Sequence, residues 1–195
     1  MYRVFLAAMD TVPAAVVLIP VFGVLYGTVY SCDLKKTVFH CLFCLYLSAV
    51  FVLVGIPNVT YFRPEVNLNL IPFRGMMEDL KNCILNVVLF VPLGFFLPVL
   101  WHRFRKLGSC AVFGFGFSLF IELLQMLTFR ATDVNDLITN TAGTALGFLL
   151  ARGVSGKKGA VGQGSGDVYL LTALSFSVMF FIHPFLSPLI WDRIL

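Results

Sequence analysis

The sequence is poor in charge. Only 12% of its 195 residues are Asp, Glu, Lys or Arg, whereas these residues make up about a quarter of an ordinary soluble domain. Hydrophobic residues account for 59%, a balance that excludes an ordinary soluble domain and predicts an integral membrane protein. Because one span takes about 20 apolar residues, the chain has room for about five to seven helices and little else. We therefore expect a single integral membrane domain over residues 1–195.

Cysteine and clustered basic residues are also scarce. The five cysteines are an odd number and lie scattered in apolar surroundings, which excludes a disulfide-stapled scaffold. Cys41 and Cys44 next to His40 have the spacing of a redox or metal pair, but they fall inside a predicted spanning helix, where free cysteine serves mostly as a small buried hydrophobe. No run of Lys and Arg exceeds two residues, which argues against nucleic-acid binding.

Motifs of familiar enzymes are missing. The sequence contains no HExxH, no glycine-rich phosphate loop and no Ser/His/Asp arrangement of a known hydrolase. Its polar stretches offer neither the imidazole nor the thiolate expected of a zinc site. We therefore assign no metal ligand and no cofactor from the sequence, and it leaves open whether the protein is an enzyme.

Long hydrophobic runs are abundant. They predict an all-α membrane protein, a polytopic helical bundle of about six transmembrane helices. The predicted spans are residues 12–30, 38–56, 83–101, 109–128, 134–151 and 168–190. A Gly/Ser/Lys-rich linker, residues 152–167, precedes the last span. Six spans make a thin bundle, which is compatible with a homodimer but does not require one.

The connections between spans suggest an orientation. Three connections carry basic residues and fall on one face of the membrane, the inner face by the positive-inside rule. These residues are Lys35, Lys36, Arg103, Arg105, Lys106, Arg152, Lys157 and Lys158. Both chain ends then lie outside, and the strongly polar residues of the third, fourth and fifth spans meet at the outer leaflet.

The stretch FIELLQMLTFRATDVNDLITNTAG, residues 120–143, concentrates this polarity. At about 100° per residue, Ser118, Glu122 and Gln125 share one stripe of the fourth span. A second stripe, on the fifth span, contains Asp133, Asp136, Asn140, Gly143 and Gly147. The two glycines have a small-xxx-small spacing, which predicts a close helix approach that lets Glu122 and Gln125 reach Asp136 and Asn140.

A carboxylate in a span costs about 2.5–3.5 kcal/mol at the helix centre, so it is retained mainly where it pairs or works. Glu122 could pair with Arg130 or with an amide. Alternatively, Arg130 could hold a phosphate or carboxylate. Glu122, Asp133 and Asp136 could bind a hard cation such as Mg²⁺ or Ca²⁺, or act as candidate catalytic acid and base groups. Spacing alone does not choose among these sites.

The third span and the stretch before it complete the polar set. Pro92, Gly94 and Pro98 predict a loosened or kinked helix. The preceding residues 63–82 are too apolar for a tail, so we expect them to fold back over the site as a lid or interfacial segment. Asn67, Asn69 and Arg74 are then candidate rim contacts.

Several of these motifs together resemble the VanZ-like family of small bacterial membrane proteins. They are NLNLIPF, NVVLFVPLGFFLP, HRFRK, SLFIELLQ and RATDVNDLITNTAGTALG, spread over a core of about residues 67–151. The flanking helices, residues 12–56 and 168–190, lie outside the recognisable part. By resemblance, the family's polar pattern falls on the ligand-binding candidates Asn86, Glu122, Gln125, Arg130, Asp133, Asp136 and Asn140.

The resemblance implies a multi-pass protein of the bacterial cytoplasmic membrane. The family's namesake is associated with low-level teicoplanin resistance, typically without vancomycin resistance. Our first hypothesis is binding: an outward-facing polar pocket engages a lipid-linked cell-wall precursor or a lipoglycopeptide among the membrane lipids. The alternative is an intramembrane hydrolase or transferase acting on a lipid phosphate or glycolipid. Transport ranks last, because the inward halves of the fourth and fifth spans contain only small, apolar and hydroxyl groups.

Overall fold

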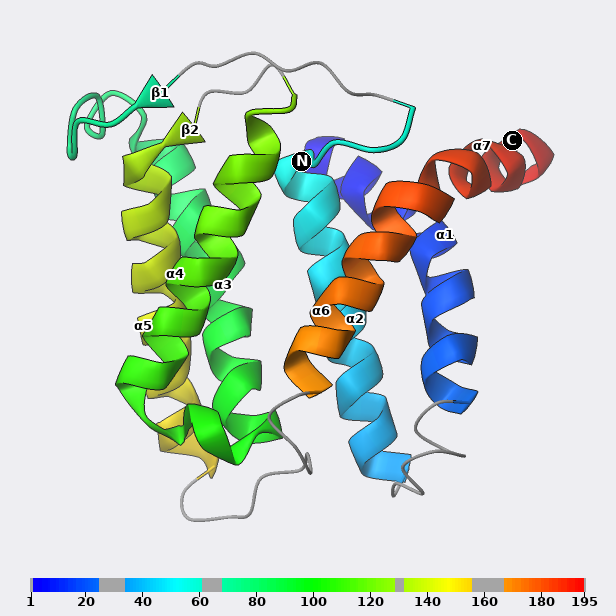
Figure 1. The fold of residues 1–195 in the computed structure, drawn as a ribbon, viewed down its shortest axis with the longest axis horizontal. Coiled ribbons are helices and arrows are strands. Elements are labelled where there is room, and N and C mark those ends of the chain that lie inside the picture. Colours follow the sequence, from blue (N-terminus) through cyan, green and yellow to red (C-terminus); the bar gives the residue numbers. More distant parts are fainter. Residues whose placement is uncertain (1, 25–33, 61–67, 129–131, 156–166, 195) are drawn as a thin grey trace. The chain divides into compact units, whose positions relative to one another are not determined.

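The computed structural model describes residues 2–24, 34–60, 68–128, 132–155 and 167–194. Its helices are α1 (Tyr2–Val24), α2 (Leu34–Val54), α3 (Leu80–Leu100), α4 (Leu107–Gln125), α5 (Val134–Ser155), α6 (Asp167–Ser177) and α7 (His183–Ile194). A 3₁₀ turn, η2 (His102–Arg105), joins α3 to α4, and a π-helical turn, η3 (Val178–Ile182), joins α6 to α7. Helices therefore occur at all six predicted positions (Figure 1).

Among the described residues, four helical stretches are long and apolar enough to cross a membrane: Lys36–Val54, Leu80–Leu100, Leu107–Gln125 and Asp167–Asp192. In α1, the apolar part Thr11–Val21 is shorter than a full span. The helix α5 is not among the four, because its first half carries Asn135, Asp136 and Asn140 between its apolar residues. The predicted all-α, polytopic membrane fold is confirmed.

Residue contacts divide the chain into two compact units, Met1–Phe62 with Gly166–Leu195, and Arg63–Ser165. In the first unit α2 packs against both α1 and α6. Phe43, Leu47 and Phe51 of α2 are fully buried there, and the ring of Phe51 meets that of Phe176 edge-on at 5.9 Å. This unit buries mainly apolar side chains.

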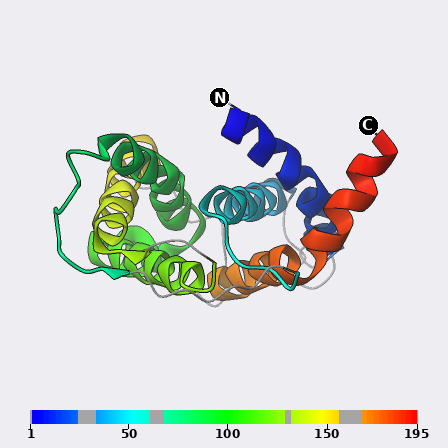
Figure 2. The same cartoon turned by 90° about the horizontal axis from the view of Figure 1, so that it is seen from above.

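The second unit consists of α3, α4 and α5. Figure 2 looks along these helices and shows α5 beside both α3 and α4, with which it makes its contacts. The helix α3 runs parallel to α5, and α4 runs antiparallel to both, since η2 turns the chain back (Figure 1). Phe90, Phe117 and Phe148 fill the core between them. The helix α3 continues from Leu80 to Leu100 through Pro92 and Pro98, so neither proline ends it.

Five small residues bring these helices together. This small-residue contact consists of Gly94, Gly114, Gly143, Thr144 and Gly147. A Cβ atom added at Gly143 or Gly147 would collide with the backbone of α3, at the carbonyl oxygens of Val87 and Val91. The prediction that this glycine pair admits the helix carrying Glu122 is therefore wrong, because the pair faces α3. It is Thr144 that meets α4, against Gly114.

Two short strands close one end of the second unit. Strand β1 (Leu68–Asn69) pairs in parallel with β2 (Thr132–Asp133), with Leu68 opposite Thr132 and Asn69 opposite Asp133. Figure 1 shows both strands at the end of the unit where α3 and α5 begin and α4 ends. The stretch before α3 thus folds back to the connection between α4 and α5. Its role as a lid or interfacial segment stays a prediction.

Candidate functional site

Asp133 ties three parts of the chain together at this end. It precedes α5, and its Oδ1 accepts a hydrogen bond from the backbone N–H of Asn135 at 2.8 Å, as a helix cap does. Its Oδ2 accepts from Asn69 Nδ2 at 3.0 Å. Its own backbone N–H donates to Oε2 of Glu122 at 3.0 Å. Glu122 is 1% exposed, so a buried carboxylate of α4 fixes the start of α5.

Asn135 holds the loop that precedes α3. Its Oδ1 accepts from the backbone N–H of Phe73 at 2.7 Å, and its Nδ2 donates to the carbonyl oxygen of Arg74 at 3.0 Å. The amide of Asn135 thus satisfies one backbone N–H and one backbone C=O of this loop, as the backbone of a neighbouring strand would. Phe73 has a φ of 64°, a left-handed conformation that few bulky residues adopt. Asn135 therefore stabilises an unfavourable turn.

One helical turn further in, α3 and α5 are joined by side chains. Asn86 Nδ2 donates to Oδ1 of Asp136 at 2.7 Å. An amide donor next to a carboxylate satisfies part of that group's need for hydrogen bonds away from bulk water. We call the residues of these two layers the polar end: Asn69, Asn86, Glu122, Asp133, Asn135 and Asp136.

A third polar layer lies deeper, between α4 and α5. Asn140 Nδ2 donates to Oγ of Ser118 at 2.9 Å, and both residues are buried. Within the described residues, Oδ1 of Asn140 is buried without a hydrogen-bond partner. Below this layer Thr144 donates to the carbonyl oxygen of Asn140 at 3.0 Å, and the small-residue contact begins. Asp136, Asn140 and Thr144 lie four residues apart on α5. At a rise of about 1.5 Å per residue, successive layers are therefore about 6 Å apart along the helix.

The structure brings together five of the residues predicted as ligand-binding from the sequence: Asn86, Glu122, Asp133, Asp136 and Asn140. Gln125 is buried at the end of α4, where its carbonyl oxygen accepts a hydrogen bond from Thr128 at 3.1 Å. Arg130 and Asn67 lie outside the described residues, so the alternative in which Arg130 pairs with Glu122 stays a hypothesis. Arg74 contributes its backbone carbonyl to the network.

Sequence reasoning missed the role of Asn135. It lies between Asp133 and Asp136 in the polar stretch of residues 120–143. The helical stripe that contains those two residues leaves it out. No local signal indicates this role, because its partners Phe73 and Arg74 lie 62 and 61 residues away in the sequence. Thr132 was also missed; its hydroxyl donates to the carbonyl oxygen of Glu122 at 3.1 Å.

The carboxylates of the polar end serve as hydrogen-bond acceptors from amides and backbone N–H groups. Across residues 2–24, 34–60, 68–128, 132–155 and 167–194, no three His, Cys, Asp or Glu side chains form a group that could hold a metal ion. The hard-cation site considered from the sequence therefore finds no support in this region. These carboxylates are thus placed to accept hydrogen bonds at one end of the unit formed by α3, α4 and α5.

The fold and this hydrogen-bonded end define a class: a polytopic helical membrane protein in which three helices carry a polar end. The VanZ/LLP1 family model matches residues 38–155, and the chain belongs to this family. The match includes α2, which the motifs over residues 67–151 do not reach. The chain is 38% identical over 87 residues to a protein of Enterococcus faecium named Protein VanZ. The aligned part covers 43% of this chain and 52% of that protein, so the chain matches about half of the relative's length. No solved structure matches.

Proposed function

We propose that this VanZ/LLP1 protein protects the cell envelope against lipid-tailed glycopeptides such as teicoplanin. In this proposal the polar end faces outward from the bacterial cytoplasmic membrane. It engages an amphiphilic molecule there, either a lipid-linked cell-wall precursor or the lipoglycopeptide itself. The observation that carries the proposal is the joining of Asp133 and Asp136 to Asn69 and Asn86 at one end of the unit formed by α3, α4 and α5.

The chemistry of an amphiphile fits the two kinds of surface in this unit. Carboxylate and amide oxygens of the polar end would accept hydrogen bonds from hydroxyl, amide or ammonium groups of a head group. The exposed apolar side chains of α3, including Leu85 and Val88, would lie along a lipid tail. Arg130, in the connection between α4 and α5, stays our candidate for an anionic group on the same ligand.

The outward orientation rests on the basic turn at the other end of the unit. The turn η2 and the residue after it contain His102, Arg103, Arg105 and Lys106. The polar end lies where α3 begins, and these residues follow the end of α3. The positive-inside rule places such a turn in the cytoplasm and hence the polar end outside.

The enzymatic alternative is a weaker second candidate. It would use Glu122, Asp133 or Asp136 as a general base on a lipid phosphate or glycolipid. Both side-chain oxygens of Asp133 already accept hydrogen bonds, from Asn69 and from the backbone of Asn135. This pattern favours positioning of the chain over proton transfer for Asp133, and we rank binding first.

The test is antibiotic susceptibility of a bacterial host that carries empty vector, wild type, Glu122→Gln, Asp133→Asn or Asp136→Asn at equal membrane abundance. Glu78→Gln is the matched control, because Glu78 is an exposed carboxylate close to the polar end and outside its hydrogen bonds. We expect wild type and Glu78→Gln to protect against teicoplanin but not vancomycin, and the other three variants to lose protection.

Two outcomes would overturn this proposal. If wild type gives no protection in a host where the Enterococcus faecium relative does, the resistance function is wrong. If all three neutralised variants protect as well as wild type, the polar end is not the working site. Mass spectrometry of lipids that copurify with the protein, before and after incubation, separates binding from cleavage: an intact bound lipid supports binding, and a shortened one supports the enzyme.

A further inference from the structure

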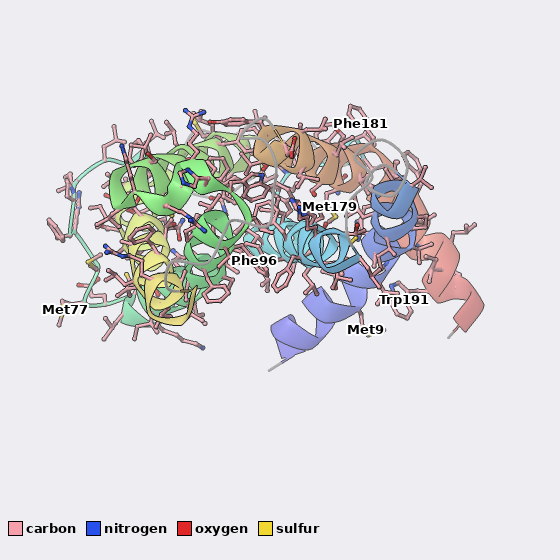
Figure 3. All side chains as sticks on the ribbon, turned by 90° about the horizontal axis from the view of Figure 1, so that it is seen from below. Met9, Met77, Phe96, Met179, Phe181 and Trp191 are labelled. Atoms are coloured by element: carbon pink, nitrogen blue, oxygen red, sulfur yellow. The ribbon has the colours of Figure 1, made fainter. Side chains whose placement is uncertain are left out.

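The loop before α3 exposes large apolar side chains. We call residues 70–77 the anchor loop. Leu70, Ile71, Phe73 and Met77 are 67%, 54%, 68% and 84% exposed, and Met77 projects away from the helices of its unit (Figure 3). Isolated apolar residues on a protein surface are ordinary, but four exposed ones within eight residues indicate a surface that contacts a partner.

The position of the anchor loop indicates what that partner is. The loop leads directly into α3, one of the four stretches able to cross a membrane. The first turns of α3 expose Leu80, Ile84, Leu85 and Val88, side chains that a spanning helix presents to lipid. Between the loop and this lipid-facing surface lie the exposed charged residues Glu78 and Asp79. Charged side chains at the start of a spanning helix mark the level where the bilayer meets water, so the loop lies at the boundary of the bilayer.

The charges near the anchor loop cancel. Arg74 and Lys81 contribute two positive charges, and Glu78 and Asp79 contribute two negative ones. Binding to a lipid surface scales with buried apolar area and with attraction to anionic head groups. With no net charge in this stretch, only the first contribution remains.

We propose that residues 70–77 insert into the boundary between lipid head groups and acyl chains, driven by apolar burial and independent of head-group charge. The inference goes beyond the proposed function and does not depend on it. The loop is held in shape for this contact by Asn135, which bonds Phe73 and Arg74. A second tie runs from Sγ of Cys83 to the carbonyl oxygen of Met76 at 3.9 Å. Because Asn135 belongs to the first turn of α5, the inserted loop links the bilayer to the start of that helix.

Tryptophan fluorescence of the full chain in phosphatidylcholine nanodiscs tests the insertion. The variants are Phe73→Trp and Met77→Trp. The parent protein contains Trp101 and Trp191, so its fluorescence is subtracted from that of each variant. Glu78→Trp is the matched control, because it follows Met77 and replaces a charged side chain that must stay in water. Lipid brominated near the start of its acyl chains should quench the first two at least roughly twofold more than the control.

Acrylamide dissolved in the water phase quenches tryptophans that are exposed to water. It should therefore quench Glu78→Trp more than Phe73→Trp or Met77→Trp. Equal lipid quenching at all three positions, or stronger acrylamide quenching at Phe73→Trp and Met77→Trp, would overturn the insertion. Quenching by neither agent would mean that protein covers the loop, which also overturns it. Replacing part of the phosphatidylcholine by phosphatidylglycerol should leave the quenching unchanged; an increase would show that head-group charge drives the contact. Ile71→Trp provides a second exposed position if Phe73→Trp fails to fold.

Discussion

The polar end and the small-residue contact share the helix α5, yet they hold it in different ways. At the polar end Asp133 and Asp136 join the start of α5 to β1, α3 and α4 through hydrogen bonds, and Asn135 joins it to the anchor loop. Two turns deeper, Gly143 and Gly147 let the backbones of α3 and α5 approach until no Cβ fits. In lipid, where apolar burial does not drive helices together, both close packing and interhelical hydrogen bonds are needed.

This difference determines which of the two regions tolerates amino-acid substitution. A backbone contact cannot move aside for an added methyl group, whereas a hydrogen bond between side chains can be replaced by another of similar geometry. We therefore expect the small-residue contact to govern stability and the polar end to be adjustable, which leaves it available for a ligand.

The largest effect should come from Gly147→Ala. The added Cβ would collide with the carbonyl oxygen of Val91 and approach the backbone nitrogen of Phe95, and overpacking of this kind costs about 1–3 kcal/mol, here toward the upper end. Thermal unfolding of the purified protein in detergent measures it. Gly153→Ala is the control in the same helix, because nothing lies within 4 Å of its added Cβ. Equal melting of the two variants would show that α3 and α5 are not in backbone contact.

A smaller effect is expected from Asp133→Ala. The substitution removes the cap on Asn135 and the acceptor of Asn69. Loss of a helix cap alone costs about 0.5–2 kcal/mol. Asp133→Asn retains the capping oxygen, and Asn and Asp are nearly equal as caps, but its NH₂ group no longer accepts from Asn69 Nδ2. It should therefore lose about 0.5–1.5 kcal/mol for that one hydrogen bond, less than Asp133→Ala. The same thermal assay compares both variants. If Asp133→Asn is as unstable as Asp133→Ala, the negative charge itself holds the polar end together.

Hydropathy predicted the helices because long apolar runs have few alternatives in a membrane. Helical periodicity also placed Asp136 and Asn140 on the inner side of α5 and Ser118 and Glu122 on the facing side of α4, since those stripes follow from 3.6 residues per turn. The sequence alone was therefore enough to predict that these residues share the facing sides of α4 and α5.

The partners within the group could not be predicted. A small-xxx-small spacing says that some helix approaches closely but not which one, and Gly143 and Gly147 receive α3. Strands of two residues, such as β1 and β2, have no periodicity to read. The pairing of Asn135 with the loop at Phe73 joins residues 62 apart, and only tertiary structure brings these together.

The smallest effect should occur where the two regions meet, at Asn140. Its Nδ2 bonds Ser118, but within the described part of the chain its Oδ1 has no partner. Hydrogen bonds between membrane helices average about 0.6 kcal/mol, and an unsatisfied buried acceptor costs about 1–3 kcal/mol. Asn140→Leu removes the unsatisfied acceptor, but it also removes the bond and leaves the buried Ser118 hydroxyl without its amide partner. These contributions largely offset, so its stability should lie within about 1 kcal/mol of wild type.

Ser118→Ala complements this test, because it keeps Asn140 and takes away the hydroxyl to which its Nδ2 donates. It should cost about 1 kcal/mol, and adding Asn140→Leu should recover most of that loss, since replacing both partners by apolar groups is close to neutral. A loss above about 2 kcal/mol for Asn140→Leu would mean that Oδ1 is engaged after all, by water or by a bound molecule reaching in from the polar end. If Asn140→Leu instead keeps its stability and loses protection against teicoplanin, that oxygen belongs to the working site and the ligand extends beyond the polar end into the bundle.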